Sequence, residues 1–216
     1  MRRVLDEDMF DKISNEGMDT TTEWKIKNAA RSVFHRKGYA ATRTRDIAEE
    51  AGINIALLNY YFRSKQKLFE LIMFETMRDF LQNMSLVFND EKTTLEKKVE
   101  IMADKYIDFI TKEPEIPLFI MSEIRNDPDK FLERLPVANL IKNSVLIKQH
   151  QLAVEKGELN EPNVLHFIIN MMSLVMFPFI ANPMLKKIGN LDDSSFNTLM
   201  QNRKKLIPSW IKAMFT

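Results

Sequence analysis

Residues 42–69 hold the side chains with the most specific chemistry in this chain of 216 residues. Asn59 carries an amide that can form two hydrogen bonds to the edge of an adenine in the DNA major groove. Tyr60 and Tyr61 carry hydroxyl groups that could reach a phosphate or a base edge. We therefore predict a DNA-reading surface, and its other candidate residues are Arg43, Thr44, Arg45, Asn54, Ile55, Ala56 and Lys65.

The other candidates would position the chain on DNA rather than read its sequence. Residues 43–45 are expected to contact the DNA backbone, and Lys65 is expected to contact a phosphate at the start of the following helix. Asn54 is expected to cap a helix, and Ala56 is small enough to allow close approach. Ile55 could meet thymine methyl groups or pack against an earlier helix, and the sequence leaves both alternatives open.

Residues typical of enzymes and metal sites form no pattern in this sequence. The chain has no Cys and only three scattered His, namely His35, His150 and His166. It has no glycine-rich phosphate loop and no Gly-x-Ser-x-Gly turn. We therefore predict no catalytic residues, no metal site and no cofactor.

The candidate DNA-reading residues must be positioned by short helices joined by a tight turn. Their apolar spacing predicts helices at about 22–37, 44–51 and 54–61. Thr42 or Thr44 could cap the second helix, and Gly52 could supply the turn because glycine adopts positive φ easily. Leu58 and Phe62 are expected to point into a small core. This is the layout of a helix-turn-helix, at about residues 43–62.

Charge is distributed unevenly along a chain whose net charge is only +1. Residues 1–20 carry a net charge of −3, residues 21–67 a net charge of +6, and residues 68–216 a net charge of −2. The excess positive charge therefore coincides with the helix-turn-helix, where a phosphate-binding surface is expected.

Beyond the helix-turn-helix, the sequence predicts a second and larger helical domain. Ser64 could cap a long helix at about 65–88, and further helices are predicted at about 92–112, 115–126, 137–157, 162–180 and 192–215. This gives an all-α protein of about nine helices with three segments: an acidic extension (1–20, flexible or a short helix), a DNA-binding domain (21–67) and a C-terminal helical domain (68–216).

The most apolar run covers residues 167–180 and is too short for a membrane span, which needs about 20 residues. The N-terminal residues have no apolar segment typical of a secretory signal. We therefore expect a cytoplasmic protein with no membrane partner.

Residues 24–69 resemble the DNA-binding domain of the Tet repressor (TetR) family of bacterial transcriptional regulators. The resemblance lies in the runs AARSVFHRKGYAATRTRDIAEEAGIN and LLNYYFRSKQKLF. Family members often have Tyr where this chain has Asn59, His where it has Tyr61, and Glu where it has Gln66. These departures concern the operator sequence rather than DNA binding itself.

The resemblance implies a homodimer that binds a two-fold operator and releases it when a small molecule binds the C-terminal domain. The last two helices are expected to pair with those of a second copy. Part of each helix must form an intramolecular core, and that alternative stays open for any of its residues. The residues that apolar spacing selects for the dimer interface are Phe167, Met171, Met172, Val175, Phe179, Phe196, Met200, Ile207, Trp210 and Ile211.

The middle helices could enclose a lipophilic effector, although aromatic and Met residues at helical spacing are often simply core. The candidate wall residues are Phe80, Met84, Phe88, Tyr106, Phe109, Phe119 and Met121. His150 and His166 could add polar contacts. The leading hypothesis is a ligand-responsive repressor, and the alternative is a DNA-bound assembly protein that recruits a protein partner and has no small-molecule effector.

Overall fold

The computed structural model describes the backbone of residues 7–213 and the side chains of residues 21–213. Within them the chain is all-α and has twelve helices rather than the nine expected. They are α1 (Glu7–Ala41), α2 (Thr44–Ala51), α3 (Ile55–Phe62), α4 (Lys65–Asn89), α5 (Leu95–Lys112), α6 (Ile116–Asn126), α7 (Pro128–Arg134), α8 (Val137–Lys142), α9 (Val145–Glu155), α10 (Val164–Ile180), α11 (Asn182–Gly189) and α12 (Asp193–Lys212).

The extra helices arise where local chemistry starts a new helix. Asp127 accepts a hydrogen bond from the backbone N–H of Lys130 and begins α7 with a proline directly after it. Ser144 similarly caps α9 through the N–H of Ile147, so the single helix predicted at 137–157 is two. Capping side chains of this kind satisfy the free N–H groups of a helix start.

The first helix is longer than its apolar spacing predicts. It begins at Glu7, so residues 7–20 of the acidic extension are helical, and residues 1–6 lie outside the described part of the chain. Its backbone leaves the helical conformation at Gly38, which has φ 73° and ψ 163°. The break therefore lies at the glycine where the sequence predicts the helix to end.

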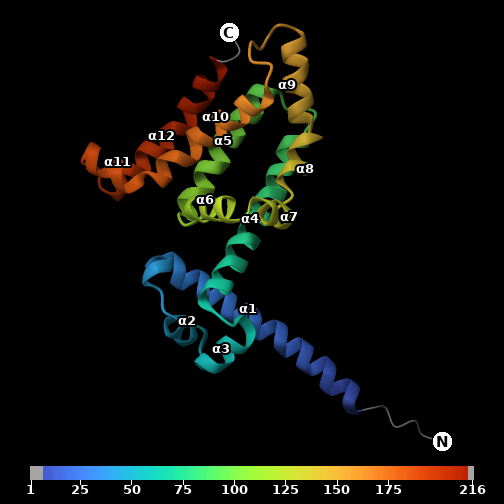
Figure 1. Cartoon of the computed structure of the whole chain (residues 1–216), viewed down its shortest axis with the longest axis vertical. Helices are drawn as coiled ribbons and strands as arrows, with labels where there is room; N and C mark the ends of the chain where they lie inside the picture. The colour runs from blue at the N-terminus through green and yellow to red at the C-terminus, as the bar shows by residue number, and fades with distance from the viewer. Residues whose placement is uncertain (1–6, 214–216) are drawn as a thin grey trace, which may run out of the picture. The chain divides into compact units, whose positions relative to one another are not determined.

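The chain divides into two compact units, Met1–Met73 and Phe74–Thr216, and we call them the N-terminal and C-terminal units. In the N-terminal unit, α2 packs against α1 and α3 packs against α2 (Figure 1). Their shared core is apolar and fully buried, and its central members are Ile26, Ala30, Val33, Ile47, Leu58 and Leu68.

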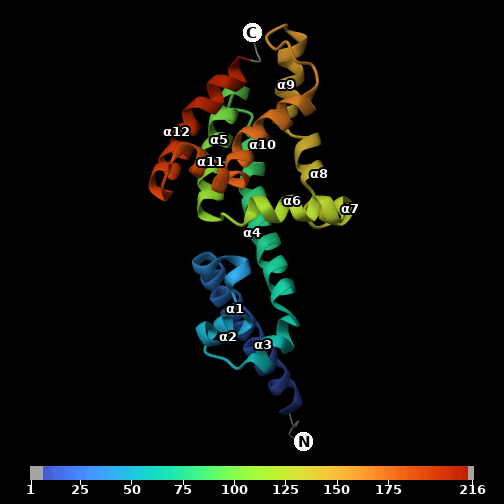
Figure 2. The same cartoon turned by 60° about the vertical axis from the view of Figure 1, so that its left-hand side comes forward.

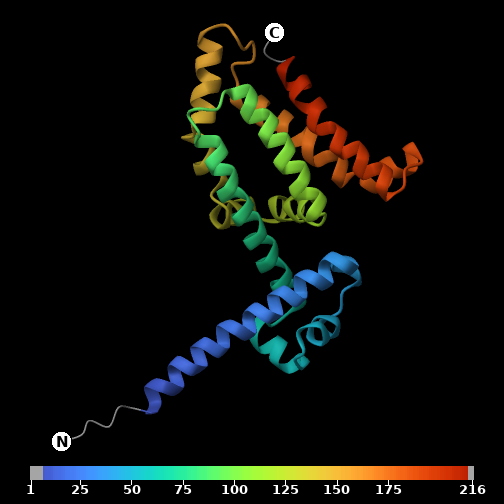
Figure 3. The same ribbon diagram turned by 180° about the vertical axis from the view of Figure 1, so that it is seen from behind.

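The C-terminal unit is built on three helices that lie side by side, α5, α10 and α12 (Figure 3). The helix α9 packs against α5 and α10, and α6 packs against α7 and α10 (Figure 2). One cluster of buried residues, which we call the C-terminal core, joins α4, α5, α9, α10 and α12.

In the described residues, no single helix is long and apolar enough to cross a membrane. The helices α10 and α11 meet that length and composition criterion only as a pair, and a bend of 71° separates them.

Candidate functional site

The start of α2 is fixed by Asp46 rather than by either predicted threonine cap. The Asp46 carboxylate accepts a hydrogen bond from the backbone N–H of Arg43 at 2.8 Å and pairs with Lys37 at 3.0 Å. The hydrogen bond to the Arg43 N–H, followed by the pairing with Lys37, lowers the pKa of Asp46. Thr42 is buried, and its hydroxyl donates to the Gly38 carbonyl instead.

The turn between α2 and α3 depends on the backbone conformation of Gly52. Its φ of 66° and ψ of 33° lie in the left-handed region, and its N–H donates to the carbonyls of Ala48 and Glu49. A Cβ at this position would meet no atom within 4 Å, so the requirement for glycine is conformational rather than steric. Asn54 then caps α3, because its side-chain oxygen accepts from the N–H of Leu57 at 2.8 Å.

The helix α3 presents an exposed face opposite its two buried residues. Leu58 and Phe62 are buried, as predicted. Tyr60 is 76% exposed and Ile55 is 38% exposed, so Ile55 is not buried against α1. The other exposed residues of α3 are Ala56 and Asn59.

The second tyrosine of α3 lies differently from the first. Tyr61 is half-buried, and its ring is edge-on to that of Tyr60, with 5.5 Å between the ring centroids. Of the two hydroxyl-bearing residues, Tyr60 is therefore the more accessible to a base or phosphate.

The residues before α3 that could contact DNA are accessible to different extents. Arg43 and Arg45 are exposed, and Thr44 is half-buried. A salt bridge from Arg36 to Glu50 at 2.9 Å links α1 to α2, the helix that contains Thr44 and Arg45.

Lys65 is held by the protein, which conflicts with its predicted role as a free phosphate contact. Its ammonium donates to the carbonyls of Tyr39 at 2.9 Å and Thr42 at 2.8 Å. It also lies 4.2 Å from the centroid of the Tyr39 ring. These contacts use two of its three N–H donors and tie the start of α4 to the connection between α1 and α2.

Two basic residues missed in the sequence analysis are better placed to contact phosphate. Arg63 directly follows α3 and is exposed, with a positive φ of 59°. Lys67 lies in the first turn of α4 and is also exposed. The excess positive charge of residues 21–67 was the available signal for both, but no spacing rule singled them out.

The seven predicted effector residues do not share one environment. Met84 and Phe88 belong to the C-terminal core, and Phe80, Tyr106 and Phe109 are half-buried against it. The Phe80 ring stacks on that of Phe109 with 4.0 Å between centroids.

The remaining two effector candidates, Phe119 and Met121, lie elsewhere. Phe119 is edge-on to Phe74, with 5.2 Å between their ring centroids, and lies outside the C-terminal core. Met121 is 42% exposed on α6 and so does not enclose a cavity. Burial raises the pKa of the Tyr106 phenol far above its usual value.

Most of the predicted dimer interface is wrong, because those residues pack inside the protein's own fold. Seven of the ten are at most 2% exposed and belong to the C-terminal core: Phe167, Met171, Val175, Phe196, Met200, Ile207 and Ile211. Met172 and Phe179 are half-buried against the same core, and only Trp210 is well exposed, at 43%.

The opposite faces of the same two helices carry exposed apolar side chains, which we call the α10–α12 surface. Its members are Leu165, Ile169, Phe177, Leu199, Leu206 and Trp210. Arg203, which interrupts the apolar spacing of α12, donates to the Leu174 carbonyl of α10 at 2.7 Å. Its guanidinium lies 5.0 Å from the centroid of the Trp210 ring, so the polar residue joins the two helices instead of breaking the surface.

Among the described residues, no three His, Cys, Asp or Glu side chains are grouped so that they could hold a metal ion. His166 pairs with Glu161 at 2.8 Å on the surface, and His150 is buried on α9.

Comparison with known proteins agrees with the geometry of the N-terminal unit. Residues 26–72 match the family model of the bacterial regulatory proteins of the tetR family. The chain is 24% identical over 177 residues to the Bacillus subtilis protein named "Probable HTH-type transcriptional regulator YttP". That match covers 79% of this chain and 83% of YttP.

Solved structures share the fold of most of the chain. The FadR regulator of Bacillus subtilis, solved in complex with stearoyl-CoA, is similar with a TM-score of 0.55 and 18% identity, over 86% of this chain and 97% of FadR. A transcriptional regulator from Cytophaga hutchinsonii is similar with a TM-score of 0.55 and 22% identity, over 88% of this chain and 97% of that regulator.

These findings agree on one class of protein. The family model covers the helix-turn-helix, the relative extends over most of the chain, and the structural similarity includes the C-terminal unit. The class is one of transcriptional regulators rather than enzymes. Residues 26–72 are therefore similar to the DNA-binding segment of the bacterial regulatory proteins of the tetR family, and the chain as a whole is similar to a probable transcriptional regulator of the helix-turn-helix type.

Proposed function

We propose that this regulator is a homodimeric repressor that reads a two-fold operator through α3 and releases it when a lipophilic small molecule binds the C-terminal core. We expect it to act in the cytoplasm. The observation that carries the proposal is the exposed face of α3, where Asn59 and Tyr60 lie opposite the buried Leu58 and Phe62.

In this proposal, Asn59 pairs with an adenine, and Ile55 contacts thymine methyl groups. The exposed cations Arg43, Arg45 and Arg63 contact phosphates and set the register of α3 in the groove. Lys65 contributes by holding the start of α4 and not as a principal phosphate contact.

The α10–α12 surface supports the dimer. Large exposed apolar patches are uncommon on monomers and typically mark an interface. Two copies joined through this surface would present two α3 helices to successive major grooves, which requires half-sites about 34 Å apart.

The C-terminal core supports the sensor. Aromatic side chains from α4 and α5 and Met side chains from α10 line its margin, and Met adapts to ligands of different shape. Because α4 supplies residues to both units, a ligand that favours one arrangement of α4 would change the affinity for the operator.

The alternative function, recruitment of a protein partner without an effector, is favoured by a second apolar stripe. Leu118, Met121 and Ile124 follow one another at intervals of three on α6, and each is at least 42% exposed. In that alternative, the N-terminal unit would still bind DNA, and a protein partner that packs on this stripe would be recruited to the bound site.

Selection of binding sites from random duplexes tests the proposal, with wild-type protein and the Asn59→Ala variant. We expect the wild type to enrich a two-fold sequence, and the variant to lose discrimination at one position of each half-site by about 1–3 kcal/mol. Enrichment of a site without two-fold symmetry, or the same preferred sequence for both proteins, would contradict the assignment. Light scattering on the same samples gives the oligomeric state.

A further inference from the structure

Arg63 holds a backbone conformation that is unusual for a residue with a side chain. Among the described residues five have a positive φ, and three of them are glycines, which adopt it without strain: Gly38, Gly52 and Gly157. The fourth is Asn190, whose φ of 49° and ψ of 46° lie in the left-handed region that asparagine tolerates. The fifth is Arg63, with φ 59° and ψ −38°.

This conformation makes Arg63 the centre of a γ-turn between α3 and α4. The N–H of Ser64 donates to the carbonyl of Phe62 at 2.6 Å, so the hydrogen bond spans a single residue. A γ-turn with a positive φ at its centre is rare and strained. The N–H of Arg63 closes α3 on the carbonyl of Asn59, and the Ser64 hydroxyl caps α4 through the N–H of Lys67. Two residues therefore join the helices, and one of them is strained.

Both ends of this short connection are fixed by other contacts. On one side Phe62 is buried in the N-terminal unit. On the other side Lys65 donates to the carbonyls of Tyr39 and Thr42. Strained conformations persist where the surrounding structure over-determines them, and they occur preferentially at functional sites. The strain at Arg63 therefore calls for a function of this residue.

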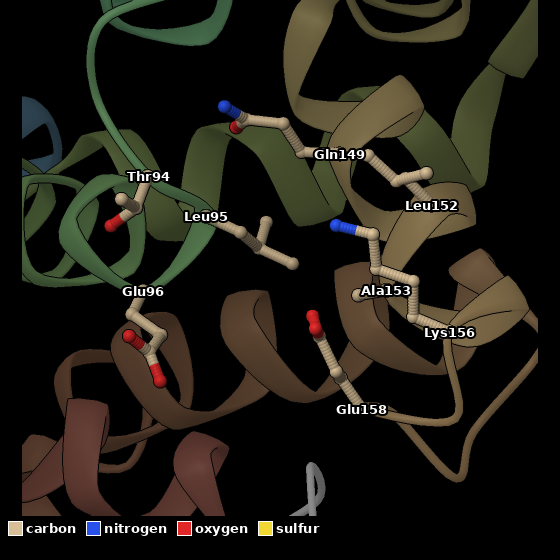
Figure 4. A pocket seen from close by; sticks show the side chains of 8 residues that line it. All are labelled: Thr94, Leu95, Glu96, Gln149, Leu152, Ala153, Lys156 and Glu158. Atoms are coloured by element: carbon tan, nitrogen blue, oxygen red, sulfur yellow. The ribbon is translucent and has the colours of Figure 1, made fainter.

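The end of α9 shows a turn in which the cation and the positive φ belong to different residues. Lys156 directly follows α9 and keeps a right-handed helical backbone, with φ −79° and ψ −7°. The next residue, Gly157, takes the positive φ of 71°. The Lys156 side chain extends into a recess beside Leu95 (Figure 4). At the end of α3 the cation itself takes the strained position, although glycine would adopt it without strain.

The side chain of Arg63 distinguishes it from the glycines at the other turns. It is exposed, and no other described group engages its guanidinium in a hydrogen bond or an ion pair. The exposed Asn59 and Tyr60 lie one helical turn before it on α3. A guanidinium can form two parallel hydrogen bonds to a phosphate. Because the backbone of Arg63 is already fixed, less conformational freedom is lost when such a contact forms.

We infer that Arg63 is a positioning residue of the DNA-binding site. The strained turn holds its guanidinium at the end of α3, where it pairs with a phosphate and fixes the register of α3 in the major groove. The strain lowers the stability of the N-terminal unit, and the phosphate contact raises its affinity for DNA. This inference rests on the proposed reading of DNA by α3, to which it adds a cation whose position is built into the backbone.

Thermal unfolding of the full chain tests the strain. Arg63→Gly should raise the unfolding midpoint by about 2–4 °C, because relief of strain exceeds the effect of the greater freedom of glycine in the unfolded chain. Arg63→Ala should leave the midpoint unchanged, because alanine keeps the strain and loses only an exposed side chain. Asn190→Gly is the control at a tolerated positive φ and should raise the midpoint by less than about 1 °C.

Anisotropy titrations with a duplex of random sequence, at several salt concentrations, test the phosphate contact. Arg63→Ala and Arg63→Gly should both weaken binding about tenfold and reduce the slope of log affinity against log salt by about 0.9. Arg63→Lys should keep the slope, because it keeps the charge. Lys156→Ala also removes one exposed cation, but from the C-terminal unit, and as the matched control it should change neither quantity.

Moving the charge tests whether its position matters. Gln66 is exposed in the first turn of α4, so Arg63→Gly together with Gln66→Arg keeps the net charge of the wild type. This double variant should still bind the duplex enriched by the wild type about tenfold more weakly than the wild type does. Equal affinity would mean that only net charge matters, and the positioning role would be wrong.

The outcomes separate this inference from the function on which it rests. If the wild type and all Arg63 variants bind duplexes equally well, the reading of DNA by α3 stands and the role of Arg63 falls. If Arg63→Gly is no more stable than the wild type, the strain is wrong and the inference falls with it. If the wild type binds no duplex at low salt, the proposed function falls and takes this inference with it.

Discussion

The helices α3 and α10 were both assigned a binding face from their residue pattern, and the structure treats them differently. On α3 the two residues expected to point inward are buried, and Asn59 and Tyr60 between them are exposed. On α10, Phe167, Met171 and Val175 were expected at an interface and are each 1% exposed in the core. Apolar spacing identifies the outward face of a helix only when one face is apolar and the opposite face is polar. The helix α10 is apolar on nearly all sides, so its spacing does not show which side faces the core.

The largest expected effect distinguishes the two faces of α10. Phe167→Ala removes a buried ring and should lower the free energy of unfolding by about 3–5 kcal/mol. Ile169→Ala, two residues away and 56% exposed, should change the stability of the protomer by less than about 0.5 kcal/mol. Urea unfolding measures both values.

The same pair of variants tests the dimer surface. Ile169→Ala should make the oligomeric state more dependent on concentration, as measured by light scattering over a dilution series. If instead Phe167→Ala changed the oligomeric state and left the free energy of unfolding unchanged, the burial of Phe167 in its own protomer would be wrong.

The fold class followed from composition and spacing because the strongest signals were local. Gly38 and Gly52 end helices through positive φ, which the sequence predicts directly. The helix count did not follow, because α7 and α8 have too few residues for a periodic pattern and only one residue separates the start of α11 from the end of α10. The inward face of α10 depends on α5 and α12, and those contacts lie far away in sequence.

A second prediction compares two lysines at the start of α4. Lys65→Ala removes two hydrogen bonds from an ammonium to backbone carbonyls and should lower the free energy of unfolding by about 1–3 kcal/mol. Lys67→Ala should leave stability unchanged and reduce the slope of log affinity against log salt by about 0.9, the value for one lost phosphate contact. Anisotropy titrations of the selected operator at several salt concentrations measure the slope.

These two lysines also mark the limit of what the sequence could say about the candidate site. The exposed positions of α3 follow from helical spacing, because its two inward residues, Leu58 and Phe62, define one face and leave the others outward. The role of Lys65 depends on where the carbonyls of Tyr39 and Thr42 lie, and these residues stand at the end of α1 and directly after it, more than 20 residues earlier. A salt slope that fell for Lys65→Ala and not for Lys67→Ala would restore the role expected from the sequence.

The smallest expected effect is the pH dependence that the buried His150 gives to the free energy of unfolding. In the unfolded chain the imidazole of His150 has its ordinary pKa of about 6.5. Burial lowers its pKa in the folded chain, and the one carboxylate that faces it, Glu161, opposes this shift only in part. As the pH falls below about 6.5, the unfolded state therefore takes up a proton before the folded state does, and the free energy of unfolding falls.

The difference in free energy of unfolding between wild type and His150→Leu, measured by urea unfolding at about pH 7.5 and pH 5.5, isolates this contribution. We expect His150→Leu to gain on the wild type as the pH falls, because leucine has no proton to bind. A difference that stayed constant with pH would mean that the folded protein protonates His150 as readily as the unfolded chain does. The ring would then be open to water, and its burial in the C-terminal core would have to be given up.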